Sequence, residues 1–187
     1  MDIYKTLEKN TGYLKMRLLS LVLIVFLASG CSVNPNVSLA RNLIKEGDTY
    51  FSTGEIDKSI EVWTEALKYG QTAEPYEKIV MSYIIKNQLD EAEKWVKTGL
   101  IYFPNNVNLS FDFALISFYK DDFFTARELA DRVLKMNEYY RDAHYLKGLM
   151  YEAEGNILAA KREYVSEVNV NPGSRRAWTK LRELRDE

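Results

Sequence analysis

The chain contains little of the chemistry on which most enzymes and metal sites depend. Its 187 residues include one cysteine, one histidine and four prolines. A lone cysteine excludes an internal disulfide bond, and with only one histidine beside it a zinc site lacks its usual ligands. Neither a glycine-rich phosphate-binding motif nor a G-x-S-x-G nucleophile motif occurs in the sequence. We therefore expect no enzymatic activity, no cofactor and no metal.

Charge of one sign is not in large excess either. The 25 lysine and arginine residues nearly balance the 27 aspartate and glutamate residues, and the formal net charge is −2. Basic residues are densest at the C-terminus, where acidic residues are interleaved among them: Arg175, Arg176, Lys180, Arg182, Glu183, Arg185, Asp186 and Glu187. Cations near a helix C-terminus are favourable without any ligand, so we expect no nucleic-acid partner.

Long hydrophobic runs are limited to one segment near the N-terminus. The run from Leu18 to Ala28 is broken only by Ser20, and Lys15 and Arg17 precede it. Spanning a bilayer takes about 20 apolar residues. This run is too short for that, and it has the length and the basic flank of a secretory signal.

The segment Ala28-Ser29-Gly30-Cys31 follows this run and resembles a bacterial lipobox, although Leu27 stands four residues before the cysteine rather than three. The resemblance implies that residues 1–30 are a signal peptide, that Cys31 is acylated with palmitate, and that residues 31–38 form a lipidated tether. The alternative is that Cys31 is a small buried apolar residue.

The same resemblance implies a location in the cell envelope. The residue after the cysteine is Ser32, whereas Asp at this place tends to retain Gram-negative lipoproteins at the inner membrane. Ser32 therefore implies the periplasmic face of the outer membrane. Asp2 and Glu8 are unusual in the basic start of a signal, and Met16 followed by Arg17 would begin a compact one. We expect translation to begin at Met16.

The rest of the chain is internally repetitive. Four small residues recur at intervals of 33, 34 and 34 residues: Ser59, Ala92, Ala126 and Ala160. An apolar residue stands three positions before each of them: Ile56, Leu89, Phe123 and Ile157. Another stands eight positions after each: Leu67, Leu100, Leu134 and Val168. A period of this length indicates stacked supersecondary units.

The pattern resembles the tetratricopeptide repeat, a helix–turn–helix unit of 34 residues. In that family, small residues at positions 8 and 20 let two helices cross closely. Position 20 holds the four small residues above, and position 8 holds Gly47, Val80, Ala114 and Gly148. The aromatic residue of position 24 is present as Trp63 and Tyr164 but replaced by Val96 and Ala130. The proline of position 32 is present as Pro104 and Pro172 but replaced by Gln71 and Glu138.

The resemblance implies an all-α fold: a right-handed α-solenoid of four such repeats over residues 39–174, closed by a capping helix at 175–187. The helices are expected near 39–53, 56–69, 73–86, 89–102, 107–120, 123–136, 141–154 and 157–169. Gly54 and Gly155 are expected in turns within repeats. On the capping helix, Trp178, Leu181 and Leu184 are expected to cover the end of the array.

In this family the first helix of each repeat lines a concave face, and we expect a protein partner to bind there. The residues expected to bind it are Ile44, Phe51, Met81, Ile84, Phe111, Leu115, Phe118, Tyr119, Tyr145 and Leu149. An exposed apolar patch normally marks a partner site, so Phe111, Phe118 and Tyr145 should be mostly exposed. The alternative is that these side chains pack against one another in a tightly curved array.

The same face argues against one use of the family. Its cytosolic chaperone co-factors hold a terminal carboxylate with Lys at position 5 and Asn at position 9. Here these positions hold Ile44, Glu77, Phe111 and Tyr145, and Asp48, Met81, Leu115 and Leu149. None of them donates strongly to a carboxylate, so an apolar or aromatic partner segment fits better.

His144 is expected to pack between helices, with proton transfer as the alternative.

These observations predict a lipid-anchored scaffold or adaptor of the cell envelope, whose apolar groove holds a segment of a protein partner. The scaffold would serve the assembly of a secretion, pilus or export machine. The alternative is an accessory protein that recruits or regulates a cell-envelope enzyme. The identity of the partner and the oligomeric state stay open at this point.

Overall fold

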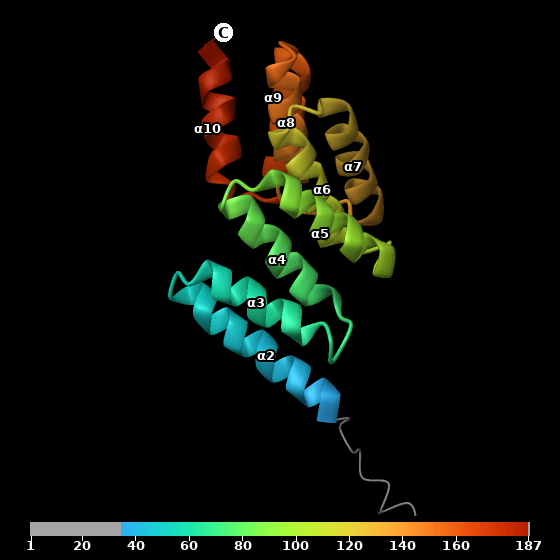
Figure 1. Cartoon of the computed structure of the whole chain (residues 1–187). Coiled ribbons are helices and arrows are strands. Elements are labelled where there is room, and N and C mark those ends of the chain that lie inside the picture. Colours follow the sequence, from blue (N-terminus) through green and yellow to red (C-terminus); the bar gives the residue numbers. More distant parts are fainter. Residues whose placement is uncertain (1–34, 187) are drawn as a thin grey trace, which may run out of the picture. The chain divides into compact units, whose positions relative to one another are not determined.

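The structure is a computed structural model that describes residues 35–186, and all its regular elements are helices (Figure 1). The predicted signal peptide, the proposed start at Met16 and the acylation site Cys31 lie outside the described residues. The chain divides into two units, Met1–Ser38 and Leu39–Glu187. Among the helices of residues 35–186, none is both long and apolar enough to cross a bilayer.

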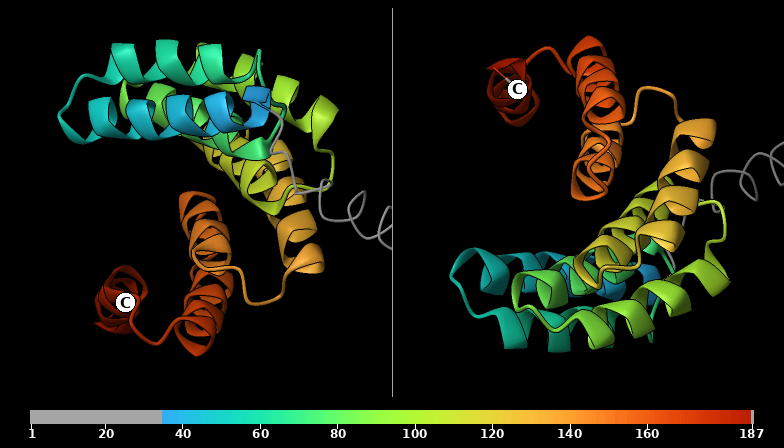
Figure 2. Two further views of the ribbon diagram at one scale, coloured as in Figure 1. Left: turned by 90° about the horizontal axis from the view of Figure 1, so that it is seen from below. Right: turned by 90° about the horizontal axis from the view of Figure 1, so that it is seen from above.

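The helices come in pairs, as the repeat predicts. Their bounds are α2 Pro35–Ser52, α3 Ile56–Ala66, α4 Ala73–Ile85, α5 Leu89–Tyr102, α6 Val107–Tyr119, α7 Phe123–Met136, α8 Ala143–Ala153, α9 Ile157–Val170 and α10 Arg175–Glu183, followed by the 3-10 turn η1 Leu184–Asp186. Within the unit that begins at Leu39, α4 also contacts α6, and α6 also contacts α8. The pairs succeed one another along a curved path (Figure 2). The all-α solenoid is thereby confirmed.

Among the paired helices, three boundaries differ from the sequence prediction by more than one residue. Helix α2 begins at Pro35, inside the predicted tether, because proline has the right φ for a first turn and needs no hydrogen bond there. Helix α3 ends at Ala66 rather than near 69, where turn hydrogen bonds to its last carbonyls replace the helix. Helix α8 begins at Ala143 rather than 141, because Asp142 adopts φ 68° and breaks the helical run.

The turn inside each pair contains one residue in the left-handed region. Gly54 and Gly155 have φ of 83° and 75°, as predicted. In the two middle pairs, Asn87 and Asp121 occupy the same place with φ of 56° and 60°. Asparagine and aspartate are the non-glycine residues that tolerate this conformation best. The four pairs therefore share one turn geometry although its residue changes.

The small residues at position 20 of the repeat are buried, as their predicted packing role requires. Ser59, Ala92, Ala126 and Ala160 are all fully buried. Side-chain oxygens cap the N-termini of four of the described helices by accepting hydrogen bonds from backbone N–H groups. The N-cap residues are Asn106 for α6, Asp122 for α7, Asn156 for α9 and Ser174 for α10. These bonds satisfy amide groups that have no partner within their helix.

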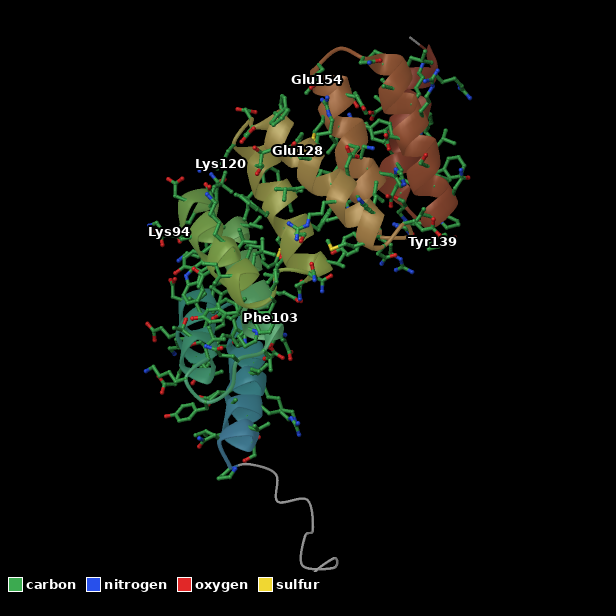
Figure 3. The ribbon with its side chains drawn as sticks, turned by 90° about the vertical axis from the view of Figure 1, so that its right-hand side faces the viewer. Lys94, Phe103, Lys120, Glu128, Tyr139 and Glu154 are labelled. Atoms are coloured by element: carbon green, nitrogen blue, oxygen red, sulfur yellow. The ribbon has the colours of Figure 1, made fainter. Side chains whose placement is uncertain are left out.

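Ion pairs connect successive pairs at their turns. Lys86, which follows α4, pairs with Asp57 of α3, and Lys120, which follows α6, lies 2.9 Å from Asp90 of α5. At the next junction the signs are exchanged, because Glu154 pairs with Arg127 of α7. Figure 3 shows Lys120 and Glu154 at the turn ends of their helix pairs.

The last helix covers the end of the array, but not with the whole predicted face. Leu184 is buried against Tyr164, and Leu181 packs beside it. Trp178 is 54% exposed, and its indole N–H donates to the carbonyl of Pro172 at 3.0 Å. Ala177 is buried instead. The prediction for Trp178 was wrong because α10 presents Ala177, not Trp178, to α9.

Candidate partner-binding site

The structure does not gather the ten predicted partner-binding residues into one exposed apolar groove. Only Met81 and Tyr119 are exposed, at 39% and 51%. Ile44 is buried in the core with Ile60 and Trp63, and its assignment to a surface site was wrong. The others are half-buried: Phe51, Ile84, Phe111, Leu115, Phe118, Tyr145 and Leu149.

The expectation that Phe111, Phe118 and Tyr145 are mostly exposed is also wrong. Phe111 and Phe118 pack against the core that includes Leu146 and Met150, and Tyr145 packs against the core at the C-terminal end. Each ring also meets another ring from a different helix or loop. The centroid distances are 5.0 Å for Phe111 to Tyr140, 5.7 Å for Phe118 to Phe123 and 5.6 Å for Tyr145 to Tyr164. In this half of the array the three rings therefore pack on core residues and on Tyr140, Phe123 and Tyr164, which lie outside the predicted set.

A cavity of about 420 Å³ lies in the other half, lined by α2, α3, α4, α6 and the loop before α8. We call it the Asp112 cavity; its lining residues are Asp48, Phe51, Trp63, Glu77, Lys78, Met81, Asn108, Asp112 and Tyr140. Two of the predicted partner-binding residues, Phe51 and Met81, contribute to it. Its volume falls in the range of about 300–1,000 Å³ that is typical of ligand-binding pockets.

One wall of the Asp112 cavity is aromatic. The Trp63 ring is almost fully buried, and its N–H donates to the carbonyl of Ile44 at 3.1 Å. Phe51 lies against this ring at a centroid distance of 5.7 Å. The hydrogen bond fixes the indole orientation, so this wall is rigid.

The cation in the cavity is already paired. The ammonium group of Lys78 lies 2.8 Å from a carboxylate oxygen of Asp48 and 3.5 Å from one of Glu74. It also lies 5.7 Å from the centroid of a Trp63 ring. Burial alone would lower the pKa of Lys78, but Asp48 and Glu74 outweigh it and raise that pKa. Lys78 therefore stays charged and is held on the Asp48 side.

A polar network holds Glu77 in the cavity wall. The side-chain amide groups of Asn106 and Asn108 donate to its two carboxylate oxygens at 2.7 and 3.0 Å. The Tyr140 hydroxyl donates to the side-chain carbonyl oxygen of Asn108 at 3.0 Å. These bonds connect α4 with the start of α6 and with the loop before α8. The donors are all neutral, so they orient the carboxylate without neutralising its charge.

Asp112 is the least compensated group of the site. It follows Asn108 by one turn of α6, lines the same cavity, and is only 6% exposed. It makes no hydrogen bond or ion pair with any other described residue. Burial and, after it, the neighbouring Glu77 carboxylate raise the pKa of Asp112 to about 7. The cavity thus combines a rigid aromatic wall with more negative than positive charge.

Sequence reasoning missed Asp112, Lys78 and Tyr140. One signal was available: Asp112 is the only charged residue in the stretch Phe111–Tyr119. A charge inside an apolar helix is costly unless it is paired or has a function. The repeat pattern used for the sequence prediction assigns no role to the position of Asp112, so comparison with that pattern did not single it out.

His144 belongs to a separate cluster. Its Nδ1 lies 2.7 Å from a carboxylate oxygen of Glu163, and Lys147 lies 3.0 Å from the other oxygen. The pKa of Glu163 is lowered, because His144 and Lys147 together outweigh the opposing effect of burial. The histidine therefore takes part in an interhelical polar contact between α8 and α9. Within residues 35–186, no group of three or more His, Cys, Asp and Glu side chains is arranged to hold a metal ion.

Comparison of the sequence with profiles of known protein families and with curated protein sequences gives no match. Solved structures do match. The pilF protein of Pseudomonas aeruginosa has a TM-score of 0.72 and 12% identity, over 81% of this chain and 69% of that one. MamA from Desulfovibrio magneticus RS-1 has a TM-score of 0.69 and 15% identity, over 83% of this chain and 86% of that one. A thermophilic tetratricopeptide-repeat protein of Thermus thermophilus has a TM-score of 0.66 and 17% identity, over 78% of this chain and 80% of that one. The chain therefore has a tetratricopeptide-repeat-like fold, as its sequence predicts.

Proposed function

We propose that this chain is a lipid-anchored scaffold of the bacterial cell envelope that holds a segment of a protein partner in the Asp112 cavity. The observation that carries the proposal is the cavity itself, with its rigid aromatic wall, the exposed Met81 and an unpaired buried carboxylate. Repeat folds of this kind use the surface of successive helices for binding. We therefore expect the residues that recognise the partner to lie on α2, α4 and α6 rather than in the apolar half of the array.

The proposed anchor is the acylated Cys31, which precedes the first described helix by only a few residues. A short connection of this kind would keep the array close to the membrane surface. One acyl chain gives only marginal membrane binding, so firm anchoring requires the further chains that a lipobox cysteine receives.

A site-specific photo-crosslinker tests the proposed binding site in cells. We would place a benzoylphenylalanine at Met81, which lines the cavity, and in a control chain at Ile101, which is 77% exposed on α5. The proposal expects a discrete crosslinked protein from position 81 and none from position 101. Equal adducts from both positions, or none from either, would contradict it.

The identity of the crosslinked protein separates the two functional classes that the sequence leaves open. A structural part of a secretion, pilus or export assembly would support the scaffold. An enzyme of the cell envelope would support the alternative, in which the chain recruits or regulates that enzyme.

A further inference from the structure

The Asp112 cavity is lined by three carboxylates and by one cation, Lys78, so its negative charge is only partly neutralised. The carboxylate of Asp48 is paired with Lys78, and Glu77 is held by neutral amides. Asp112 has no partner among the described residues although it is 94% buried, being 6% exposed. Leaving a mostly buried carboxylate without a protein partner is unfavourable, and the cation that lines the cavity, Lys78, is already paired with Asp48.

We propose that the cavity receives the basic side chain, lysine or arginine, of the partner segment, with Asp112 and Glu77 as its carboxylate ligands. This inference rests on the proposed function, because it names the chemistry of the segment held at the same site. It changes the expected partner from a purely apolar or aromatic segment to one with a cation at its centre.

The shape of the site fits such a side chain. Lysine and arginine have a long apolar stem and a charged head, and the stem packs favourably on apolar surface. Phe51 and Met81 supply that surface, while Asp112 on α6 and Glu77 on α4 line the same cavity. Two carboxylates that face one cavity suit the two-sided hydrogen bonding of a guanidinium or the several donors of an ammonium.

The charges around Asp112 favour a cation from outside over a rearrangement inside. The groups that face it from the packed elements are Glu77 and Lys78 on α4, Asp48 on α2 and Tyr140 in the loop before α8. Lys78 is held by Asp48 and Glu74. The tyrosine is neutral, since burial and the nearby carboxylates raise its pKa well above the usual range. An incoming cation would therefore be the first full positive charge against Asp112.

A binding selection tests the chemistry even while the partner is unidentified. The probe is a phage-displayed library of random twelve-residue peptides, selected on the full chain immobilised in a non-ionic detergent. We expect the selected peptides to share a lysine or arginine at one fixed place, flanked by apolar residues. Replacing it by norleucine or citrulline should weaken binding about tenfold or more, because a carboxylate is then left buried without its partner.

Matched variants locate the effect. Asp112→Asn and Glu77→Gln keep the shape of the site and each remove one negative charge, and Glu77→Gln also gives up one of the two bonds accepted from Asn106 and Asn108. Each variant should remove the preference for a basic residue. Glu128→Gln makes the same charge change at an exposed place on α7 (Figure 3) and should leave the preference intact. Circular dichroism of each variant confirms that it is folded before binding is compared.

The outcomes separate this inference from the function on which it rests. Selected peptides without a common basic residue would overturn the inference and leave the scaffold standing. Failure to select any peptide would overturn both. Spermidine or methylguanidinium bound more tightly than any selected peptide would identify a small amine as the ligand, and would also overturn it.

Proton release gives an independent readout. A cation near Asp112 favours its ionised form, so binding of a selected peptide near pH 6 should release a proton. Calorimetry in two buffers of different ionisation enthalpy measures directly how many protons are released on binding. The same measurement on Asp112→Asn should give no proton release, and release that is unchanged in this variant would contradict the assignment of Asp112.

Discussion

The indole ring of Trp63 occupies the space that a β-carbon of residue 47 would need. A β-carbon built on Gly47 would lie 2.4 Å from the indole nitrogen, closer than such contacts allow. The same relationship recurs in the fourth repeat, where a β-carbon on Gly148 would lie 2.3 Å from the Tyr164 ring. In the second repeat the corresponding residues are Val80 and Val96, and both are fully buried. In the third they are Ala114 and Ala130. In the first and fourth repeats a large ring on one helix is thus matched by glycine on the other, whereas the second repeat pairs two valines and the third pairs two alanines.

We expect Gly47→Ala to destabilise the chain by about 1–3 kcal/mol, although alanine is the better helix former. The added methyl group must displace a ring that is fixed by its hydrogen bond to Ile44. Urea unfolding measures the free energy. Gly173→Ala is the control, because its β-carbon would meet nothing closer than 3.8 Å. Equal stability of the two variants would show that the ring moves freely.

We expect Asp112→Asn to change the dependence of stability on pH. The folded pKa of about 7 lies above the unfolded value of about 3.9, so the folded chain binds the proton more tightly. The stabilisation from this protonated carboxyl is full below about pH 4 and is lost as the pH rises to about 7, by at most about 1.4 kcal/mol per pH unit. The variant should therefore gain stability over the native chain between pH 4 and pH 8. Unfolding curves with parallel pH dependence would contradict this.

We expect Leu184→Ala to cost about 2–5 kcal/mol, because this buried side chain covers Tyr164 at the end of the array. Trp178→Ala removes a larger side chain from the same helix but should cost less than about 1 kcal/mol, since that ring is mostly exposed. Thermal unfolding of both variants checks the order. A larger loss of stability for Trp178→Ala would show that Trp178 covers the end of the array, as predicted from the sequence.

We expect Phe118→Ser to destabilise the chain by about 2–3 kcal/mol, roughly half the cost of removing a fully buried phenylalanine. The reason is its packing against the Phe123 ring and the core of the third repeat. Phe124→Ser, at a ring that is 74% exposed, should change stability by less than about 0.5 kcal/mol. If the two variants melted alike, Phe118 would be a free surface residue after all.

We expect Cys31→Ser to abolish labelling with radioactive palmitate and to shift the chain from the detergent phase to the aqueous phase. The reason is that the lipobox thiol is the predicted acylation site. Phase partitioning of native and variant chains measures the shift, with Ser32→Ala as a control that keeps the thiol. Label that persists on the Cys31→Ser chain would exclude the anchor.

The helix pairs could be predicted because their determinants are local and repeat along the chain. Gly47, Val80, Ala114 and Gly148 recur in step with Ser59, Ala92, Ala126 and Ala160, and all eight residues are buried. The turn residues were recognised only where they are glycine. Asn87 and Asp121 take the same left-handed conformation, but most asparagine and aspartate residues do not, so their type alone did not identify them.

The sequence by itself determined the period, the pairing of helices and the small residues buried within each pair, because these depend on residues three to thirty-four positions apart. Tertiary structure alone decided which first-helix residues stay accessible. That depends on how neighbouring elements cover them: the Tyr140 ring covers Phe111, whereas Met81 has no such cover. It also decided that Asp48, Glu77 and Asp112, from three different helices, share one cavity. Their charges acquire a common effect only because burial removes the water that would screen them from one another.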